Sequence, residues 1–440
     1  MLLEFSFANF RSFRGLTTLS MVAAKISSKY KELDINNVFK ADTKLNLLKS
    51  KAIYGQNASG KSNIVKALVT FLMIVRHSVK SEEVISKLAT PFQLSSANVE
   101  EPTFFQIILR ASRKGEEDAA LYRYGFEVKD GKIVTEWLFG KTGREEVPFF
   151  TRQGMDIQVH GRFREAKKFA GLSRSGDNEI FRDNSLFLTA VSAMGGTFAK
   201  SITKIIGDIT VVMGLEDPRS KSVLQEVLQD KEAKDSILAL MRAADFDIEN
   251  IESLDTDDNH QVPPDDMPDE LKELFRPGKI KKTPAFITQR SVFGPHGKKV
   301  DTMTADFDEW ESEGTKKLFY LSAFLLQTLK HGDVLFIDEF DARLHPLLTK
   351  KIVQIFNFND TNPKGAQLIF VTHDTNLLKA NLLRRDQICF VNKDRFGVST
   401  LRTLVEYKGV RNDASYDKDY LSGKYAAVPF LNRLDQIFEN

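Results

Sequence analysis

Near the N-terminus, the pattern of apolar and polar positions predicts a strand, a glycine loop and a helix in immediate succession. Residues 2–10 alternate enough to form a half-buried strand, and a second, buried strand is expected to end at Ala52-Ile53-Tyr54. After Ser62, apolar residues recur at helical spacing and predict a helix to about Lys80. The glycine-bearing residues between the second strand and the helix are therefore placed on a tight turn.

The middle of the chain changes from a strand pattern to a helical one. Strand-like segments at 104–109 and 121–128, a hairpin signal at 129–132 and further short strands predict an antiparallel meander. From about 163 to 245, apolar residues recur at helical intervals. Residues 252–271 are acidic, proline-bearing and poor in apolar side chains, so they predict a flexible segment rather than a carboxylate metal site.

Two apolar runs in the second half of the chain end in polar clusters. Val334–Ile337 precedes Asp338 and Glu339, and residues 367–371 precede Thr372-His373-Asp374. Such runs suit parallel strands that are buried on both faces, and ligands bind at the carboxyl ends of such strands in open α/β sheets. A strand pattern at 285–293 comes before both runs.

The glycine loop carries the pattern of a phosphate-binding site. Residues Gly55 to Ser62 fit G-x-x-x-x-G-K-[ST]. Gly55 and Gly60 allow backbone amides to point at phosphate oxygens, next to a helix start that favours anions. We expect Lys61 to reach the β- and γ-phosphates, Ser62 to ligate Mg²⁺, and Asn57 to contact the nucleotide. A chance glycine turn would not explain the strand before the loop and the helix after it.

Residues further along the chain complete a candidate nucleotide site. Asp338 is expected to hold Mg²⁺, directly or through water, and Glu339 to orient and deprotonate the attacking water. His373 is a candidate to sense the γ-phosphate, and the alternative is a histidine satisfied at a strand end. Ser312 and Gly314 open a predicted helix, whose start favours anions.

Composition narrows the class of protein. The 440 residues suffice for two or three domains, and 42% hydrophobic with 28% charged residues is ordinary for a globular protein. A net charge of +2 excludes binding to polyanions by bulk charge. The single cysteine, Cys389, excludes an internal disulfide, and no apolar run approaches the ~18 residues of a membrane helix. We expect a cytoplasmic protein that does not enter a membrane.

Taken together, these motifs resemble those of ABC-type ATPases of the SMC/RecF/OLD group. More narrowly, they resemble the ATPases of bacterial abortive-infection and anti-phage defence systems, of the AbiL and PARIS kind. The matching stretches are LLEFSFANFRSF, IYGQNASGKSNIVKAL, ESEGTKKL, VLFIDEFDARLHP, VTHDTNLL and SYDKDYLSGKYAAVP. The resemblance implies an α/β fold, in which an ABC-type P-loop NTPase core has a mixed sheet, flanking helices and an antiparallel β subdomain. It divides the chain into residues 1–160, an inserted helical subdomain at 161–284, and the second half of the core at 285–440.

The resemblance also assigns roles that the hydrophobic pattern does not. It implies that Arg11 and Ser12 are phosphate or ribose contacts, and that Gln93 is the Q-loop ligand of Mg²⁺. It further implies that Ser312 and Gly314 face the γ-phosphate bound by the other protomer.

The function implied is an ATP-binding and hydrolysing switch that uses Mg²⁺ and forms at least a dimer around sandwiched ATP. Its expected role is to sense phage, through a nucleic acid or a phage protein, and to control an effector from the same operon, such as a Toprim-type nuclease or another toxin. Two alternatives stay open. One is a DNA-repair or chromosome-associated SMC/RecF-like ATPase. The other is a non-hydrolysing, ATP-dependent scaffold or immunity protein that holds a toxin.

Overall fold

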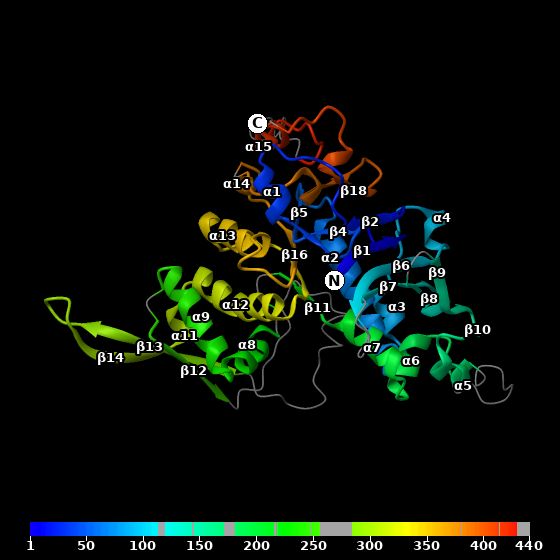
Figure 1. The fold of residues 1–440 in the computed structure, drawn as a ribbon, viewed down its shortest axis with the longest axis horizontal. Coiled ribbons are helices and arrows are strands. Elements are labelled where there is room, and N and C mark those ends of the chain that lie inside the picture. Colours follow the sequence, from blue (N-terminus) through cyan, green and yellow to red (C-terminus); the bar gives the residue numbers. More distant parts are fainter. Residues whose placement is uncertain are drawn as a thin grey trace, which may run out of the picture.

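Two large β-sheets with a helix between them organise the chain (Figure 1). The structure is a computed structural model, and it describes residues 1–112, 119–142, 145–170, 181–214, 217, 219–246, 248–255, 284–379, 381–412 and 414–428. Within these residues, no helix is long and apolar enough to cross a membrane.

The six-stranded sheet carries the loop and the two polar clusters. Its strand order is β11 (Ile209–Val212), β15 (Val334–Ile337), β16 (Gln367–Val371), β5 (Ser50–Gly55), β17 (Ile388–Lys393) and β18 (Ser399–Thr403). The first five strands are parallel, and β18 is antiparallel to β17. Every residue of β5, β15 and β16 is buried, as the continuous apolar runs predict.

Helices cover both faces of this sheet because neighbouring residues along a strand point to opposite sides. Phe336 belongs to the core that contains α2 (Lys61–His77), whereas Leu335 and Ile337 belong to the core that contains α12 (Glu313–His331) and α13 (Pro346–Asn357). The sheet is therefore covered on both faces, and the carboxyl ends of its parallel strands lie together at one edge.

The second large sheet is an antiparallel meander that packs over the other side of α2. Its order is β10 (Asp156–Val159), β9 (Glu145–Gln153), β8 (Lys132–Thr142), β7 (Ala119–Lys129), β6 (Thr103–Ser112), β1 (Leu2–Ala8) and β2 (Thr17–Ser20). The Phe71 ring on α2 stacks on Phe126 of β7 at 5.4 Å and meets Phe5 of β1 edge-on at 5.8 Å. The meander predicted from the sequence is present, and it holds the helix that follows the loop.

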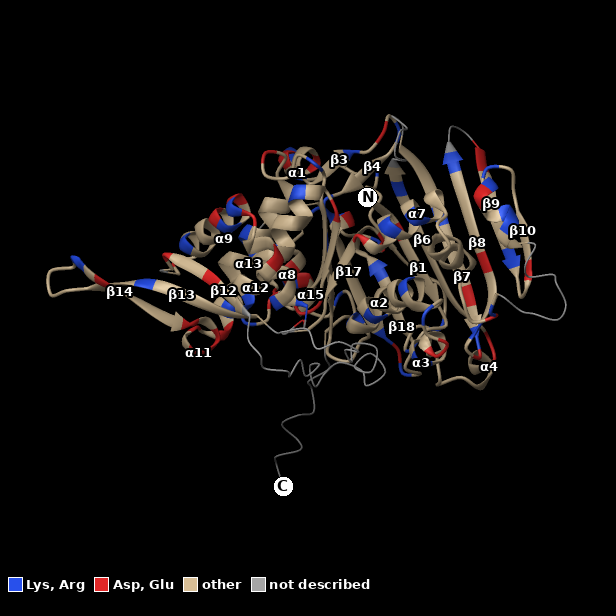
Figure 2. Cartoon of the chain, turned by 90° about the horizontal axis from the view of Figure 1, so that it is seen from below, with Lys and Arg blue, Asp and Glu red and all other residues tan. Residues whose placement is uncertain are grey.

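A third sheet projects from the body of the molecule. It consists of β12 (Asn250–Asp255), β13 (Pro284–Phe293) and β14 (Lys299–Asp306), and both views show the β13–β14 hairpin reaching outward (Figures 1 and 2). The helices α8 (Ser220–Leu228) and α9 (Lys231–Ala243) pack beside α12 at its base. The remaining elements are α1 (Lys31–Asn36), β3 (Val38–Lys40), β4 (Asn46–Leu48), α3 (Val84–Leu88), α4 (Ser96–Val99), η1 (Arg164–Ala166), α5 (Lys167–Ala170), α6 (Phe187–Ala193), α7 (Thr197–Gly207), α11 (Phe307–Trp310), α14 (Asn376–Lys379), η3 (Arg385–Gln387), η4 (Leu404–Glu406) and α15 (Tyr416–Leu421).

The fold class is α/β, as expected, but residues 161–284 are not a purely helical insertion. Residues 209–212 form β11, which is an edge strand of the central sheet, and residues 250–255 form β12 of the projecting sheet. Three of the four β11 residues are β-branched aliphatics and the fourth is threonine, a composition that favours strands. A four-residue strand between helical patterns is too short for periodicity to identify. Most of the acidic segment predicted at 252–271 lies outside the described residues, and the domain boundaries stay a prediction.

Candidate nucleotide-binding site

The glycine loop joins the carboxyl end of β5 to the first turn of α2, as the sequence predicts. Gly60 precedes the helix with φ of 109°, a left-handed conformation that disfavours side chains. A Cβ atom at this position would lie 2.5 Å from the Ser399 hydroxyl oxygen and 2.8 Å from that of Ser12. Both the backbone angle and the lack of space therefore require glycine here.

The Lys61 ammonium is held inside the loop. Its side chain is buried, and Nζ donates to the carbonyl oxygens of Gly55 at 2.8 Å and Gln56 at 2.9 Å. Burial lowers the pKa of Lys61 from 10.5 to about 8, against the opposing effect of the carboxylates of Asp338, Asp341 and Glu339. A bound phosphate would replace the lost hydration with a negative charge, so this environment suits anion binding.

Ser62 and Asp338 form the oxygen pair that could hold Mg²⁺. Burial raises the pKa of Asp338, and the neighbouring Ser62 side chain opposes that rise. A cation would stabilise the ionised carboxylate, and hydroxyl and carboxylate oxygens are the hard ligands that Mg²⁺ prefers. Across the described residues, no group of three or more His, Cys, Asp or Glu side chains could hold a metal by itself.

The segments that follow β15 and β16 are tied together at the same edge of the sheet. Glu339 lies in the turn after β15 with φ of 48°, and its neighbour Phe340 donates its amide to Val371 of β16 at 2.9 Å. The backbone amide of His373 donates to the Asp341 carboxylate at 3.1 Å. Partial burial and the nearby Lys61 charge lower the pKa of His373, so its imidazole is neutral at pH 7. The structure therefore brings the predicted base and the predicted switch histidine to the edge where the glycine loop lies.

Lys317 is a residue of this edge that sequence reasoning missed. It lies on α12, its side chain is buried, and its Nζ donates to the backbone carbonyl of Glu339 at 2.6 Å. Burial lowers its pKa from 10.5 to about 8. The available signal was a lysine next to Leu318 at the start of an apolar helix face, where a charge needs a partner.

Ser312 and Gly314 lie at the first turn of α12, as the sequence predicts. Ser312 is exposed and caps the helix, because its hydroxyl accepts from the Thr315 amide at 3.2 Å. A Cβ on Gly314 would lie 2.6 Å from the carbonyl oxygen of Arg343, in the loop that follows Glu339. Packing within one chain is thus sufficient to explain why this position is a glycine. A role opposite a second protomer's nucleotide stays a prediction.

The three residues assigned by resemblance near the N-terminus fall in different places. Ser12 lies at the end of the glycine loop, where its hydroxyl oxygen accepts from the Asn63 side chain and from the Ser399 hydroxyl, each at 2.8 Å. Arg11 occupies a left-handed turn, with its guanidinium 5.7 Å from the Phe10 ring centroid. Gln93 is exposed in the turn before α4. The hydrogen bonds of Ser12 therefore hold it against the glycine loop.

Asn57 and Tyr420 complete the surroundings of the loop. Asn57 is exposed near the middle of the loop, so its side chain is accessible to a ligand. The hydroxyl of Tyr420, on α15, hydrogen-bonds with the backbone of Gly55, and its ring meets that of Tyr54 edge-on at 5.8 Å. Tyr420 belongs to the stretch SYDKDYLSGKYAAVP, for which the sequence alone suggests no structural role.

Comparison with known proteins gives a match to a sequence family and likenesses to solved structures. Residues 214–379 match the family described as "AAA domain, putative AbiEii toxin, Type IV TA system", which covers less than half of the chain. No curated protein matches the chain significantly. Among solved structures, it is similar to the SMC head domain from Thermotoga maritima, at 13% identity and a TM-score of 0.39, over 91% of this chain and 98% of that one. The family match is to an AAA domain over residues that include Asp338, Glu339 and His373, and the geometry of the glycine loop is suited to binding a phosphate group.

Proposed function

We propose that this protein is an ATP-binding and hydrolysing switch that closes around ATP held between two copies of the chain. The observation that carries the proposal is the placement of Ser62 beside the Asp338 carboxyl at the carboxyl edge of the sheet, next to the Lys61 ammonium. Residues far apart in the sequence thereby form a donor set for a triphosphate and its cation.

The chemistry divides among the residues of this edge. Lys61 neutralises phosphate charge, and Ser62 and Asp338 would hold Mg²⁺, which would supply further positive charge to the phosphates. Glu339 accepts a proton from the attacking water, and its position depends on the Lys317 hydrogen bond to its backbone carbonyl. The backbone amide of His373 is held by the Asp341 carboxylate, and its neutral imidazole is available to donate to the γ-phosphate.

Closure between copies is supported by the exposed start of α12. Ser312 caps a long helix whose first turn is accessible, so it offers a neutral hydroxyl and a positive dipole end to an anion. Packing of Gly314 against Arg343 and the contact of Lys317 with Glu339 join this helix to the catalytic loop of the same chain. If the partner's nucleotide binds the start of α12 in one chain, the position of Glu339 in that same chain would therefore change.

For the biological role, we propose control of a toxic effector in anti-phage defence. The description of the matching family names a toxin and a toxin–antitoxin system, and that description supports a role beside a toxin rather than in DNA repair. A scaffold that holds a toxin without hydrolysing ATP differs from this proposal in a single measurable property, the release of phosphate.

The test compares wild-type protein with Lys61→Ala and, as a matched control, Lys80→Ala, which removes an exposed lysine beyond α2. Titration calorimetry measures binding of a non-hydrolysable ATP analogue with Mg²⁺, and a phosphate-release assay measures hydrolysis. Lys61→Ala should lose about 100-fold or more in affinity, since charge-assisted hydrogen bonds to two phosphates disappear. Wild-type binding without phosphate release would favour the scaffold, and equal affinity of the two variants would refute the site.

A further inference from the structure

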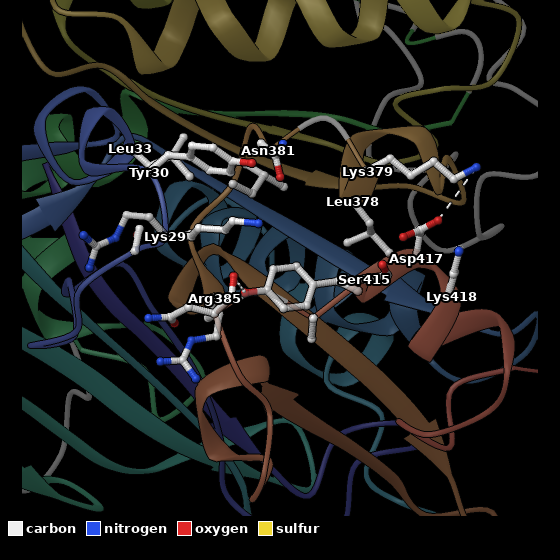
Figure 3. A pocket seen from close by; sticks show the side chains of 16 residues that line it. Lys29, Tyr30, Leu33, Leu378, Lys379, Asn381, Arg385, Ser415, Asp417 and Lys418 are labelled. Atoms are coloured by element: carbon white, nitrogen blue, oxygen red, sulfur yellow. Dashed lines mark hydrogen bonds and ion pairs between the residues drawn. The ribbon is translucent and has the colours of Figure 1, made fainter.

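A second cavity, of about 400 Å³, lies between the N-terminal segment before α1, the helix α14 and the C-terminal α15 (Figure 3). None of the glycine-loop residues lines it. Lys29 and Arg385 lie on one side of the cavity, and Lys379 and Lys418 lie on the other. Its wall includes residues 415–418, which belong to the C-terminal stretch that the resemblance singled out without a function.

The described lining of this cavity is strongly cationic. Five of its side chains are lysine or arginine, and one, Asp417, is a carboxylate. Arg384 is neutralised by Asp34 and Asp386, and Lys379 makes a long ion pair of 3.8 Å with Asp417. Within the described residues, no ion pair is found for Lys29, Arg385 or Lys418, and the first and last of these are exposed at the cavity mouth.

Two of these cations are arranged to accept an anion. The ammonium of Lys29 lies 5.5 Å from the centroid of the Tyr30 ring, at the cavity wall. Arg385 donates through one terminal nitrogen to the carbonyl of Val410 at 2.7 Å, while its buried Nε has no hydrogen-bond partner. A buried donor without a partner costs free energy unless a ligand satisfies it.

Size and chemistry together point to the class of ligand. Arginine and lysine are the side chains that bind phosphate groups, and the volume is in the range of small-molecule pockets. The rings of Tyr30 and Tyr416 line the same cavity and offer apolar faces to a base or sugar. A phosphate-bearing molecule of nucleotide size would use both features, whereas a bare inorganic anion would use only the charges.

Both helical walls of the cavity continue to the nucleotide site. The helix α14 begins three residues after His373, and α15 carries Tyr420, whose hydroxyl bonds with the backbone of Gly55. The Lys379–Asp417 pair joins the two helices at one side of the cavity (Figure 3). We propose that the cavity is a second binding site, for a phosphorylated small molecule of nucleotide size, and that its occupancy regulates the glycine-loop site through α14 and α15. The regulatory part rests on the proposed ATPase function, whereas the binding part does not.

The binding test uses full-length protein with Lys61→Ala, so that the glycine loop is disabled. AMP and inorganic phosphate are titrated separately by calorimetry. AMP should bind in this background, at least tenfold more tightly than phosphate, because only AMP reaches the tyrosine rings. Adding Lys418→Glu should weaken AMP binding at least tenfold. Adding Lys408→Glu, which reverses an exposed lysine outside the cavity, should not.

Several results would overturn the proposed second binding site or its regulatory role. Absence of AMP binding in the Lys61→Ala background would overturn the site, and so would AMP binding that is insensitive to both Lys418→Glu and Lys379→Glu. Equal affinity for phosphate and AMP would overturn the nucleotide-sized ligand. The regulatory part predicts that AMP changes the rate of phosphate release at least twofold in wild-type protein and not in Lys418→Glu, and an unchanged wild-type rate would overturn it. AMP binding by wild-type protein that does not itself bind ATP would refute the ATPase proposal alone.

Discussion

The pH dependence of nucleotide binding follows from the burial of Lys61. In the free protein, burial lowers the pKa of this ammonium to about 8, and a phosphate beside it would raise the pKa again. Binding therefore needs no additional proton below pH 8, and it needs proton uptake above pH 8. If the pKa in the complex exceeds 9, affinity should be about tenfold weaker at pH 9 than at pH 7, which is about 1.4 kcal/mol.

Calorimetric titration of ADP with Mg²⁺ at pH 7, 8 and 9 measures this slope. ADP is suitable because phosphate groups have their second pKa near ~6 and stay ionised over this range. Repeating the titrations in buffers of different ionisation enthalpy counts the protons taken up, and uptake should approach one proton at pH 9.

Two variants separate Lys61 from other groups. Lys61→Arg keeps a charge at every pH tested, so any ADP affinity that it retains should not fall between pH 7 and pH 9. Lys317→Met removes the other lysine at this edge whose pKa is about 8, and it should keep the wild-type slope. Constant wild-type affinity from pH 7 to pH 9, or a slope lost in Lys317→Met, would refute the reasoning.

Three further predictions concern hydrolysis and stability. Glu339→Gln should bind ATP with Mg²⁺ but release phosphate at least ~100-fold more slowly, and ATP should increase its mass in light scattering, which an unchanged mass would contradict. Lys317→Met should lower kcat about tenfold or more with little change in ATP affinity, because it removes a charge-assisted bond to the Glu339 carbonyl. The control Lys316→Met should be near wild type, and equal effects would contradict the assignment. Glu136, buried on β8, accepts from two amides at the start of α6 and pairs with buried Arg152, so Glu136→Ala should cost about 3–5 kcal/mol of unfolding free energy in denaturant titrations.

Much of the candidate nucleotide site at the carboxyl edge of the six-stranded sheet was predictable, because its residues lie in continuous segments of the chain. The loop from Gly55 to Ser62 needs only local backbone geometry and the helix that follows it. Asp338 and Glu339 follow a run of four buried apolar residues, and parallel strands place their carboxyl ends at one edge. Chain order and strand burial were therefore sufficient to bring these residues together.

The features that sequence reasoning missed depend on long-range packing. Lys317 was overlooked because its partner is a backbone carbonyl 22 residues away. Every residue has such a carbonyl, so residue types do not identify the partner. The strand β11 was overlooked because only its pairing with β15, across more than a hundred residues, makes it a strand. The packing of Gly314 against Arg343 likewise depends on how α12 docks beside the loop that follows Glu339. Periodicity and motifs report local preference, and none of these contacts is local.

The composite site is tested most directly by mixing two inactive variants. Ser312→Asp keeps a good helix cap and adds a carboxylate where the partner's γ-phosphate is expected, whereas Ser312→Asn keeps the cap without the charge. Substitution of Gly314 is less suitable, because a Cβ there would meet the Arg343 carbonyl of the same chain. Ser312→Asp should be inactive in phosphate release, and Ser312→Asn should retain measurable activity.

Phosphate release by a mixture of Lys61→Ala and Ser312→Asp proteins is the decisive measurement. A mixed dimer contains one intact site, formed by Lys61 of one chain and Ser312 of the other, so the mixture should regain activity that neither parent has. Mixing Lys61→Ala with Glu339→Gln is the control and should restore nothing, since both changes affect a chain's own half of the site. A Lys61→Ala and Ser312→Asp mixture that stays inactive, while subunit exchange is demonstrated by fluorescence energy transfer, would contradict a site shared between two chains.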